Sequence, residues 1–356
     1  MSIQARKYTS KSTGKTTTTY YAVIYDKRTN KTAWSKGFKS EKDARREEAR
    51  MLNDLDENLL VTKKIKFGQA MELWLEYAEK EYANSTYKGY VWYCGKFIEP
   101  VFNDKDITSI LPLHIQRFVD ALDTKYSAET INKNLNILSN IFNYANEFLH
   151  AVKSNPVEPI KRKKVKQKKI VTWNQEQISN FLNYKEVVES PYYELILTSF
   201  LLGARPSEVC GLRTNNLKSN RILKFDRGYD RYGEETNMKT NRSHREMIIS
   251  NEHYDKLINR LKEQNHQAIK SAEQDLEYDN NDFLFKQENG KPINPEVYSK
   301  NFKKLLRKYN EDPINKAKKL SLPDICLYEA RHSFATNLVS EGNVNTSLVA
   351  SIMGNS

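Results

Sequence analysis

Two arginines, each within an apolar stretch typical of a helix, are the residues of this sequence best suited to chemistry. Arg205 lies within LLGARPSEVCGL (201–212), and Arg331 lies within LYEARHSFAT (327–336). An arginine in apolar surroundings is costly to bury unless an anion meets it. Because the guanidinium fork matches two phosphate oxygens, two such arginines indicate a shared phosphodiester. The alternative is that each pairs with a local carboxylate, Glu208 or Glu329, and only holds helices together.

The motifs around these arginines resemble those of the tyrosine recombinases, the integrases of phages, conjugative transposons and genomic islands. The first family motif reads roughly G-L-R-x-S-E-hydrophobic-x-x-L, and residues 203–212 read GARPSEVCGL. The second reads H-x-L-R-H-[ST]-F-A-[ST], and residues 328–336 read YEARHSFAT. Residues 239–249 (KTNRSHREMII) fit the family's hairpin lysine, polar turn and arginine-led strand. Residues 349–356 (VASIMGNS) fit its late glycine motif, so the resemblance covers most of the chain.

The resemblance implies cleavage of DNA without a metal or a cofactor. Arg205 and Arg331 would hold the non-bridging oxygens of the scissile phosphate and stabilise its negatively charged transition state. Lys239 would protonate the leaving 5′ oxygen. Tyr328 stands where the family's first choice is histidine, and Asn355 stands where the family has histidine or tryptophan. Each can donate a hydrogen bond to phosphate, although a phenol with a pKa near 10 is a poor base at neutral pH.

Three supporting positions follow from the same motifs. Glu208, one helical turn from Arg205, would orient that arginine. His332 would support the site or touch phosphate, and the alternative is a hydrogen-bonded core histidine. Arg242, in the hairpin segment, would contact DNA.

The family's nucleophilic tyrosine has no counterpart in the printed sequence. It lies about ten residues, or three helical turns, past the late glycine, whereas this sequence ends at Ser356. We therefore expect residues 1–356 to bind a recombination site without cleaving it. The main alternative is a non-catalytic DNA-binding protein that occupies such sites. A relative of type IB topoisomerases shares the chemistry, but the arm-like N-terminal segment and the short chain argue against it.

Charge and cysteine content narrow the class of protein. The net charge is +12 and the isoelectric point is about 9.2, which favours an anionic partner. No apolar run reaches the roughly 20 residues of a membrane span. Three widely spaced cysteines, Cys94, Cys210 and Cys326, argue against a disulfide framework or a zinc site. They fit a reducing bacterial cytoplasm, with the protein on the nucleoid when it is bound to DNA.

The N-terminal part predicts a small sheet and one helix. Residues 16–25 and 32–38 are rich in strand-forming residues and flank a turn at 27–31. Ser40 begins a helix. Residues 1–60 resemble the arm-type DNA-binding domain of many integrases, whose sheet lies in a DNA groove. The alternative is a solvated β-hairpin cap.

The rest of the chain predicts mostly helices, so the expected fold class is mainly α with small β-sheets (α+β). Residues 66–155 read as a helical bundle, which resembles the core-binding (SAM-like) domain of the family. Residues 156–169 form a basic linker, either solvated or laid along DNA phosphates. Residues 170–356 correspond to the catalytic domain, truncated before the nucleophile helix. The linker cations expected to contact DNA are Lys161, Arg162, Lys163, Lys164, Lys166, Lys168 and Lys169.

The partners implied by the resemblance are all connected with recombination. Double-stranded DNA would be bound at attachment sites and at arm sites. The protein would self-associate into dimers or tetramers on DNA, and accessory DNA-bending proteins could join the complex. No membrane partner is expected.

Overall fold

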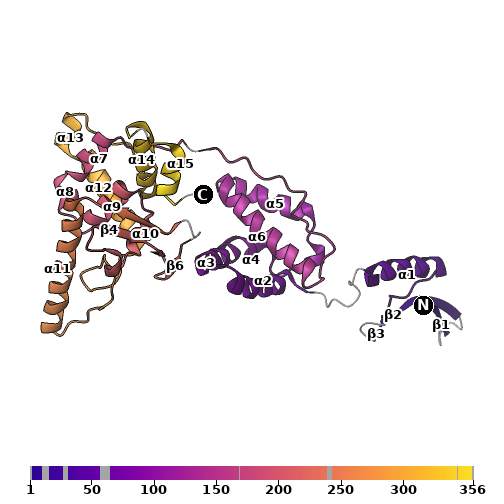
Figure 1. Ribbon diagram of the computed structural model, residues 1–356. Helices are drawn as coiled ribbons and strands as arrows, with labels where there is room; N and C mark the ends of the chain where they lie inside the picture. The colour runs from indigo at the N-terminus through magenta and orange to yellow at the C-terminus, as the bar shows by residue number, and fades with distance from the viewer. Residues whose placement is uncertain are drawn as a thin grey trace. The chain divides into compact units, whose positions relative to one another are not determined.

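The computed structural model describes residues 2–9, 16–26, 31–56, 65–167, 169–238, 243–342 and 344–354. The chain folds into two compact units, Met1–Gln167 and Lys168–Ser356 (Figure 1). Among the described residues, no helix is long and apolar enough to cross a membrane.

The first unit begins with a three-stranded antiparallel sheet and a helix. Strands β1 (Ser2–Thr9), β2 (Thr16–Asp26) and β3 (Lys31–Trp34) pair in the order β1-β2-β3, and α1 (Glu41–Asp56) follows. Ala22 and Ile24, two positions apart on β2, are buried with Met51 of α1. This period of two is what one buried sheet face requires.

Strand β1 is absent from the elements that the sequence predicts. Its side chains at positions 4–9 are all exposed, so they carry no apolar alternation that could reveal a strand. Pairing with β2 along its whole length, from Ser2 opposite Val23 to Thr9 opposite Thr16, makes it a strand. Most of the turn predicted at 27–31 lies outside the described residues.

A helical bundle completes the first unit. Its long last helix is capped by the Ser127 hydroxyl, which accepts a hydrogen bond from the Thr130 amide at 3.4 Å. Phe67 packs against both Phe102 and Phe142 in its core. The helices are α2 (Phe67–Glu81), α3 (Asn84–Tyr93), a π-helical turn (Cys94–Ile98), α4 (Glu99–Phe102), a 3-10 turn (Ile107–Ser109), α5 (Pro112–Asp123) and α6 (Ala128–Glu147).

The second unit is built around helix α9 (Tyr193–Leu202), whose residues 195–200 and 202 are buried. Trp173 stacks on Phe200 of this helix at a centroid distance of 5.3 Å. The other helices are α7 (Gln175–Leu182), α8 (Lys185–Val188), α10 (Pro206–Cys210), a 3-10 turn (Thr214–Asn216), α11 (Asn251–Glu273), α12 (Pro295–Glu311), α13 (Pro313–Ala317), α14 (Leu327–Ser340) and α15 (Thr346–Ile352).

Two short antiparallel pairs of strands lie in the second unit. Strand β4 (Ile222–Phe225) pairs with β7 (Arg245–Ile248), and β5 (Arg227–Tyr229) pairs with β6 (Glu235–Asn237). The predicted fold class, mainly helical with small sheets, is confirmed.

Candidate active site

A tight turn between α9 and α10 presents Arg205. Helix α9 ends at Gly203, which has φ +57°, and a Cβ there would lie 2.3 Å from the ring of Phe334. Only glycine meets both conditions without strain. The chain reverses at this point, so that Arg205 caps α10 and Pro206 occupies its first turn. The turn therefore fixes the backbone of Arg205 against helix α14.

The buried carboxylate of Glu208 gathers three arginines. It accepts hydrogen bonds from Arg205 Nη1 at 2.5 Å and from Arg245 Nη2 at 2.8 Å, and it lies 3.9 Å from Arg331 Nη1. Burial by itself raises the pKa of the Glu208 carboxyl, but the ion pairs with Arg245 and Arg205 hold it below its usual range. Three guanidinium groups against one carboxylate leave a net charge of +2. Such a cluster suits an anion.

Arg331 is almost completely buried, with 2% of its surface exposed. Its Nη1 donates to the Gly203 carbonyl at 2.8 Å, and its Nη2 donates to the Met353 carbonyl at 2.5 Å. Burial and the neighbouring positive charge of Arg205 lower the pKa of Arg331 to about 10. The guanidinium therefore keeps its proton at neutral pH and supplies a fixed positive charge below the surface.

The open side of the cluster is formed by Arg205 and Tyr328. The Arg205 side chain is 23% exposed and Tyr328 is 45% exposed, and the Tyr328 hydroxyl forms a hydrogen bond with Arg205. Burial acts to lower the pKa of Arg205, but Glu208 and Tyr328 hold it above its ordinary value. His332, one turn further along α14, packs edge-on against the Tyr328 ring. The exposed groups could meet an incoming phosphate.

The alternative of two separate local ion pairs holds for one arginine only. Arg205 pairs with Glu208, as that alternative requires. The Glu329 carboxylate instead accepts the Cys326 amide at 2.5 Å, and Arg331 turns toward Glu208. Both arginines therefore share one carboxylate.

Three of the predicted site residues, Lys239, Arg242 and Asn355, lie outside the described residues. Ser243, which follows Arg242, and Gly354, which precedes Asn355, are close to each other. Ser243 is buried, and its hydroxyl donates to the Gly354 carbonyl at 3.4 Å.

Arg245 was missed as a site residue in the sequence. It leads β7, its side chain is 6% exposed, and its guanidinium lies 4.5 Å from the centroid of the Phe225 ring. The only signal was the arginine-led strand of the family pattern. A strand arginine among polar residues is usually solvated, and only the contact with Glu208 distinguishes this one.

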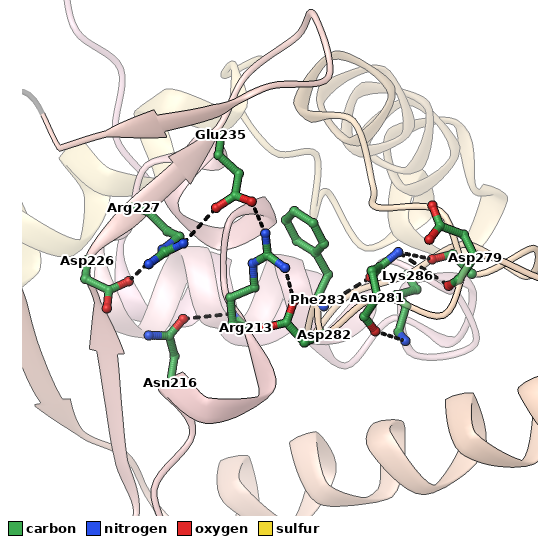
Figure 2. Close-up of polar contacts among 11 residues, drawn as sticks. Arg213, Asn216, Asp226, Arg227, Glu235, Asp279, Asn281, Asp282, Phe283 and Lys286 are labelled. Atoms are coloured by element: carbon green, nitrogen blue, oxygen red, sulfur yellow. Dashed lines mark hydrogen bonds and ion pairs between the residues drawn. The ribbon is translucent and has the colours of Figure 1, made fainter.

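A network of ion pairs fixes the β5–β6 hairpin to the body of the unit (Figure 2). Arg213 pairs with Glu235 of β6 and with Asp282, and its guanidinium lies 3.8 Å from the centroid of the Phe283 ring. Glu235 also pairs with Arg227 at 2.8 Å. The network therefore fixes β6, the strand that carries Glu235.

Replacing Arg213 with alanine is expected to lower the free energy of unfolding by about 1.5–3 kcal/mol, the range for hydrogen bonds to charged groups. The Arg213 side chain is 13% exposed, so its loss leaves two carboxylates near an apolar ring. Urea denaturation measures the change. Arg227→Ala is the matched control, because Arg227 is 47% exposed and its pair should contribute at most about 1 kcal/mol. Equal losses of unfolding free energy in the two variants would contradict the conclusion that Arg213 holds the β5–β6 hairpin to the rest of the unit.

The linker cations differ in their surroundings. Lys163 is half-buried: its backbone amide and carbonyl are both bonded to Asn132, and its ammonium pairs with Asp123 at 2.7 Å. Lys168 lies outside the described residues. The other five are exposed, and no described carboxylate pairs with them: Lys161, Arg162, Lys164, Lys166 and Lys169.

Comparison with known proteins assigns the chain to a family. Residues 172–356 match the phage integrase family, and residues 66–122 match the N-terminal SAM-like domain of phage integrases. Because the first match alone covers more than half of the chain, the protein belongs to the phage integrase (tyrosine recombinase) family. The family predicted from the sequence motifs is confirmed.

Individual relatives are distant but similar over most of their length. The chain is 23% identical to the ICEBs1 integrase of Bacillus subtilis (strain 168) over 310 residues, covering 85% of this chain and 79% of that protein. Its fold is similar to that of the Tn1549 transposon integrase bound to transposon right end DNA, with a TM-score of 0.66, 20% identity and coverage of 82% and 92%. A lambda integrase tetramer bound to a Holliday junction gives a TM-score of 0.60, 12% identity and coverage of 95% and 89%.

Proposed function

We propose that this protein is a site-specific DNA recombinase that integrates or excises a mobile element through a 3′-phosphotyrosine link. The observation that carries the proposal is the three-arginine cluster around Glu208, with a net charge of +2 and an open side at Arg205 and Tyr328. Family membership supports the same activity.

In this mechanism each group has one task. Arg205 holds a non-bridging oxygen of the scissile phosphate, and Arg331 stabilises the charge of the transition state from below. Tyr328 donates a hydrogen bond to the same phosphate. As the oxygen of a deprotonated tyrosine bonds to phosphorus, the bond from phosphorus to the 5′ oxygen breaks, and the Lys239 ammonium gives the leaving oxygen a proton. Asn355 takes the remaining donor position, while Glu208 and His332 support the arginines and Tyr328.

The domain assignment belongs to the same proposal. Residues 1–60 bind arm sites, residues 66–155 bind the core site together with the catalytic domain at 170–356, and the basic linker at 156–169 follows DNA phosphates. By analogy with the lambda integrase tetramer, the protein assembles into dimers or tetramers on DNA. Accessory DNA-bending proteins would act on the same complex, in the bacterial cytoplasm where that DNA lies.

Residues 1–356 should bind a recombination site without forming a covalent link to it, because residues 329–356 contain no tyrosine. A suicide substrate, nicked near the scissile phosphate, traps any adduct for detection on a denaturing gel. An adduct formed by residues 1–356 would contradict the proposed register of the nucleophile and direct attention to Tyr328. The runner-up function, a non-catalytic protein that occupies recombination sites, predicts the same binding.

A longer gene product with a tyrosine in the family register would separate the two functions. The recombinase proposal requires that product to form the adduct, and the runner-up requires that it does not. Arg331→Lys is the control within it, because a point charge cannot replace the two-pronged guanidinium. The control should bind DNA and fail to form the adduct.

A further inference from the structure

One face of the N-terminal sheet points away from α1, and we call it the outer face. Side chains alternate along a strand, and directly paired residues share a face. Ala22 and Ile24 point toward α1, so Tyr21 lies on the outer face, and the pairs Arg6–Thr19 and Gln4–Tyr21 place Arg6 there as well. The outer-face residues include Gln4, Arg6, Tyr8, Thr17, Thr19, Tyr21, Val23, Tyr25, Thr32 and Trp34.

Arg6 is held by aromatic rings on this face. Its guanidinium carbon lies 4.8 Å from the Trp34 ring centroid and 5.7 Å from that of Tyr21, and the two rings contact each other edge to face. Gly37 makes room for this cluster, since a Cβ there would lie 2.5 Å from the Thr19 methyl group and 3.2 Å from the Tyr21 ring. The rings therefore restrict the guanidinium before any ligand arrives.

The part of the chain that the structure describes offers the Arg6 guanidinium no hydrogen-bond acceptor. Among the described residues, none forms an ion pair or a hydrogen bond with its guanidinium. Stacking on aromatic faces leaves the in-plane N–H groups free to bind an acceptor. A restrained cation with free donors is suited to a planar, acceptor-bearing partner.

Positive charge is concentrated in residues 1–40, which include the three strands of the sheet. Residues 1–40 contain nine lysines or arginines and one acidic residue, Asp26. The next acidic residues belong to α1, beginning with Glu41 and Asp43. Residues 1–40 therefore carry a net positive charge, and the outer face adds the amide, hydroxyl and guanidinium groups that read base edges.

We propose that the outer face enters the major groove of duplex DNA and that Arg6 reads a guanine there through hydrogen bonds to O6 and N7. This inference rests on the arm-site binding proposed above and names its specificity-determining residue. A β-ribbon fits the width of the major groove, and arginine with guanine is the commonest specific contact. Because Trp34 and Tyr21 already restrict the side chain, less conformational entropy is lost on binding.

Selection of binding sites from random duplexes with residues 1–356 tests the inference. The selected arm motif should contain a guanine, and replacing that base with 7-deazaguanine, which lacks the N7 acceptor, should weaken binding. Arg6→Gln should reduce affinity for the selected motif about 5- to 150-fold, the range of one bidentate base contact. In the Arg6→Gln protein, 7-deazaguanine should have no further effect.

Lys7→Gln is the matched control, because Lys7 is next to Arg6 on β1, is exposed and points to the opposite face. It removes the same charge and should weaken all duplexes slightly and equally. Arg6→Lys keeps the charge, so it should retain non-specific binding and lose the preference for guanine. Circular dichroism verifies that each variant is folded.

The outcomes separate this inference from the proposed function. Equal effects of Arg6→Gln and Lys7→Gln, or a selected arm motif without guanine, would overturn the role of Arg6 while leaving arm binding intact. Failure of the unchanged protein to select any arm motif would contradict the arm-domain proposal, and the role of Arg6 with it.

Discussion

Replacing Glu208 with glutamine is expected to lower the free energy of unfolding at neutral pH by about 3–5 kcal/mol, the range for breaking a buried ion pair. Glu208 is 2% exposed, and it supplies the negative charge that Arg205, Arg245 and Arg331 share. Glutamine keeps the shape and can still accept the Arg205 amide, so the loss reports the charge. Chemical denaturation of both proteins measures the difference.

The same substitution has a defined pH dependence. The pKa of Glu208 is lower in the folded protein than in the unfolded chain, so its stabilising effect is complete above the unfolded value of about 4.3. It is lost as the pH falls through the folded pKa. The difference between the two proteins should therefore be constant near neutrality and shrink in acid.

Glu329→Gln is the matched control for the Glu208 experiment. Glu329 occupies the equivalent capping position at the start of α14, where its carboxylate accepts the Cys326 amide. Its substitution should cost no more than about 1 kcal/mol. Inorganic phosphate should also stabilise the Glu208→Gln protein more than the unchanged protein, because the carboxylate that the three arginines share is then gone. Equal losses in the two glutamine variants would refute the shared-carboxylate interpretation.

Replacing the five exposed linker cations with serine is expected to weaken DNA binding about equally at all sequences. The residues changed are Lys161, Arg162, Lys164, Lys166 and Lys169. The slope of log K against log salt concentration should become shallower by about 4.5, since each phosphate contact contributes about 0.9. Fluorescence anisotropy across a salt series, with specific and unrelated duplexes, measures both quantities.

Lys163→Ser separates linker charge from DNA contact. This lysine belongs to the same run, but Asp123 and Asn132 already bind it within the first unit. Its substitution should change the slope by much less than 0.9. A salt slope that is unchanged by the five-residue substitution would show that the linker does not follow DNA phosphates.

The sequence was sufficient to predict an element where the residues that stabilise the element lie within it. The long helix α6 follows from Ser127 and an apolar stripe. The helical stretch predicted around Arg205 is interrupted instead, because Gly203 ends α9 and Arg205 is the extended N-cap of α10. Glu208 lies one turn from Arg205, so their pairing could be expected. The family motifs added the order of the site residues along the chain.

Strand β1 and Arg245 could not be predicted in this way. The exposed, charged strand β1 is defined only by its pairing with β2. Arg245 reaches the site because β7 pairs with β4 and brings its first residue to Glu208. In both cases the deciding contact is made with another element, so the stretch itself does not reveal it.

The sequence by itself determined the family, the mainly helical fold and the positive charge, because each depends on residue types at short spacing. Only the tertiary structure decided how that charge is arranged. Arg331 contacts the carbonyls of Gly203 and Met353 and shares Glu208 with two other arginines, although a carboxylate at Glu329 lies much closer in sequence. The physical reason is burial: a guanidinium out of water needs every nearby acceptor, and packing determines which acceptors are near.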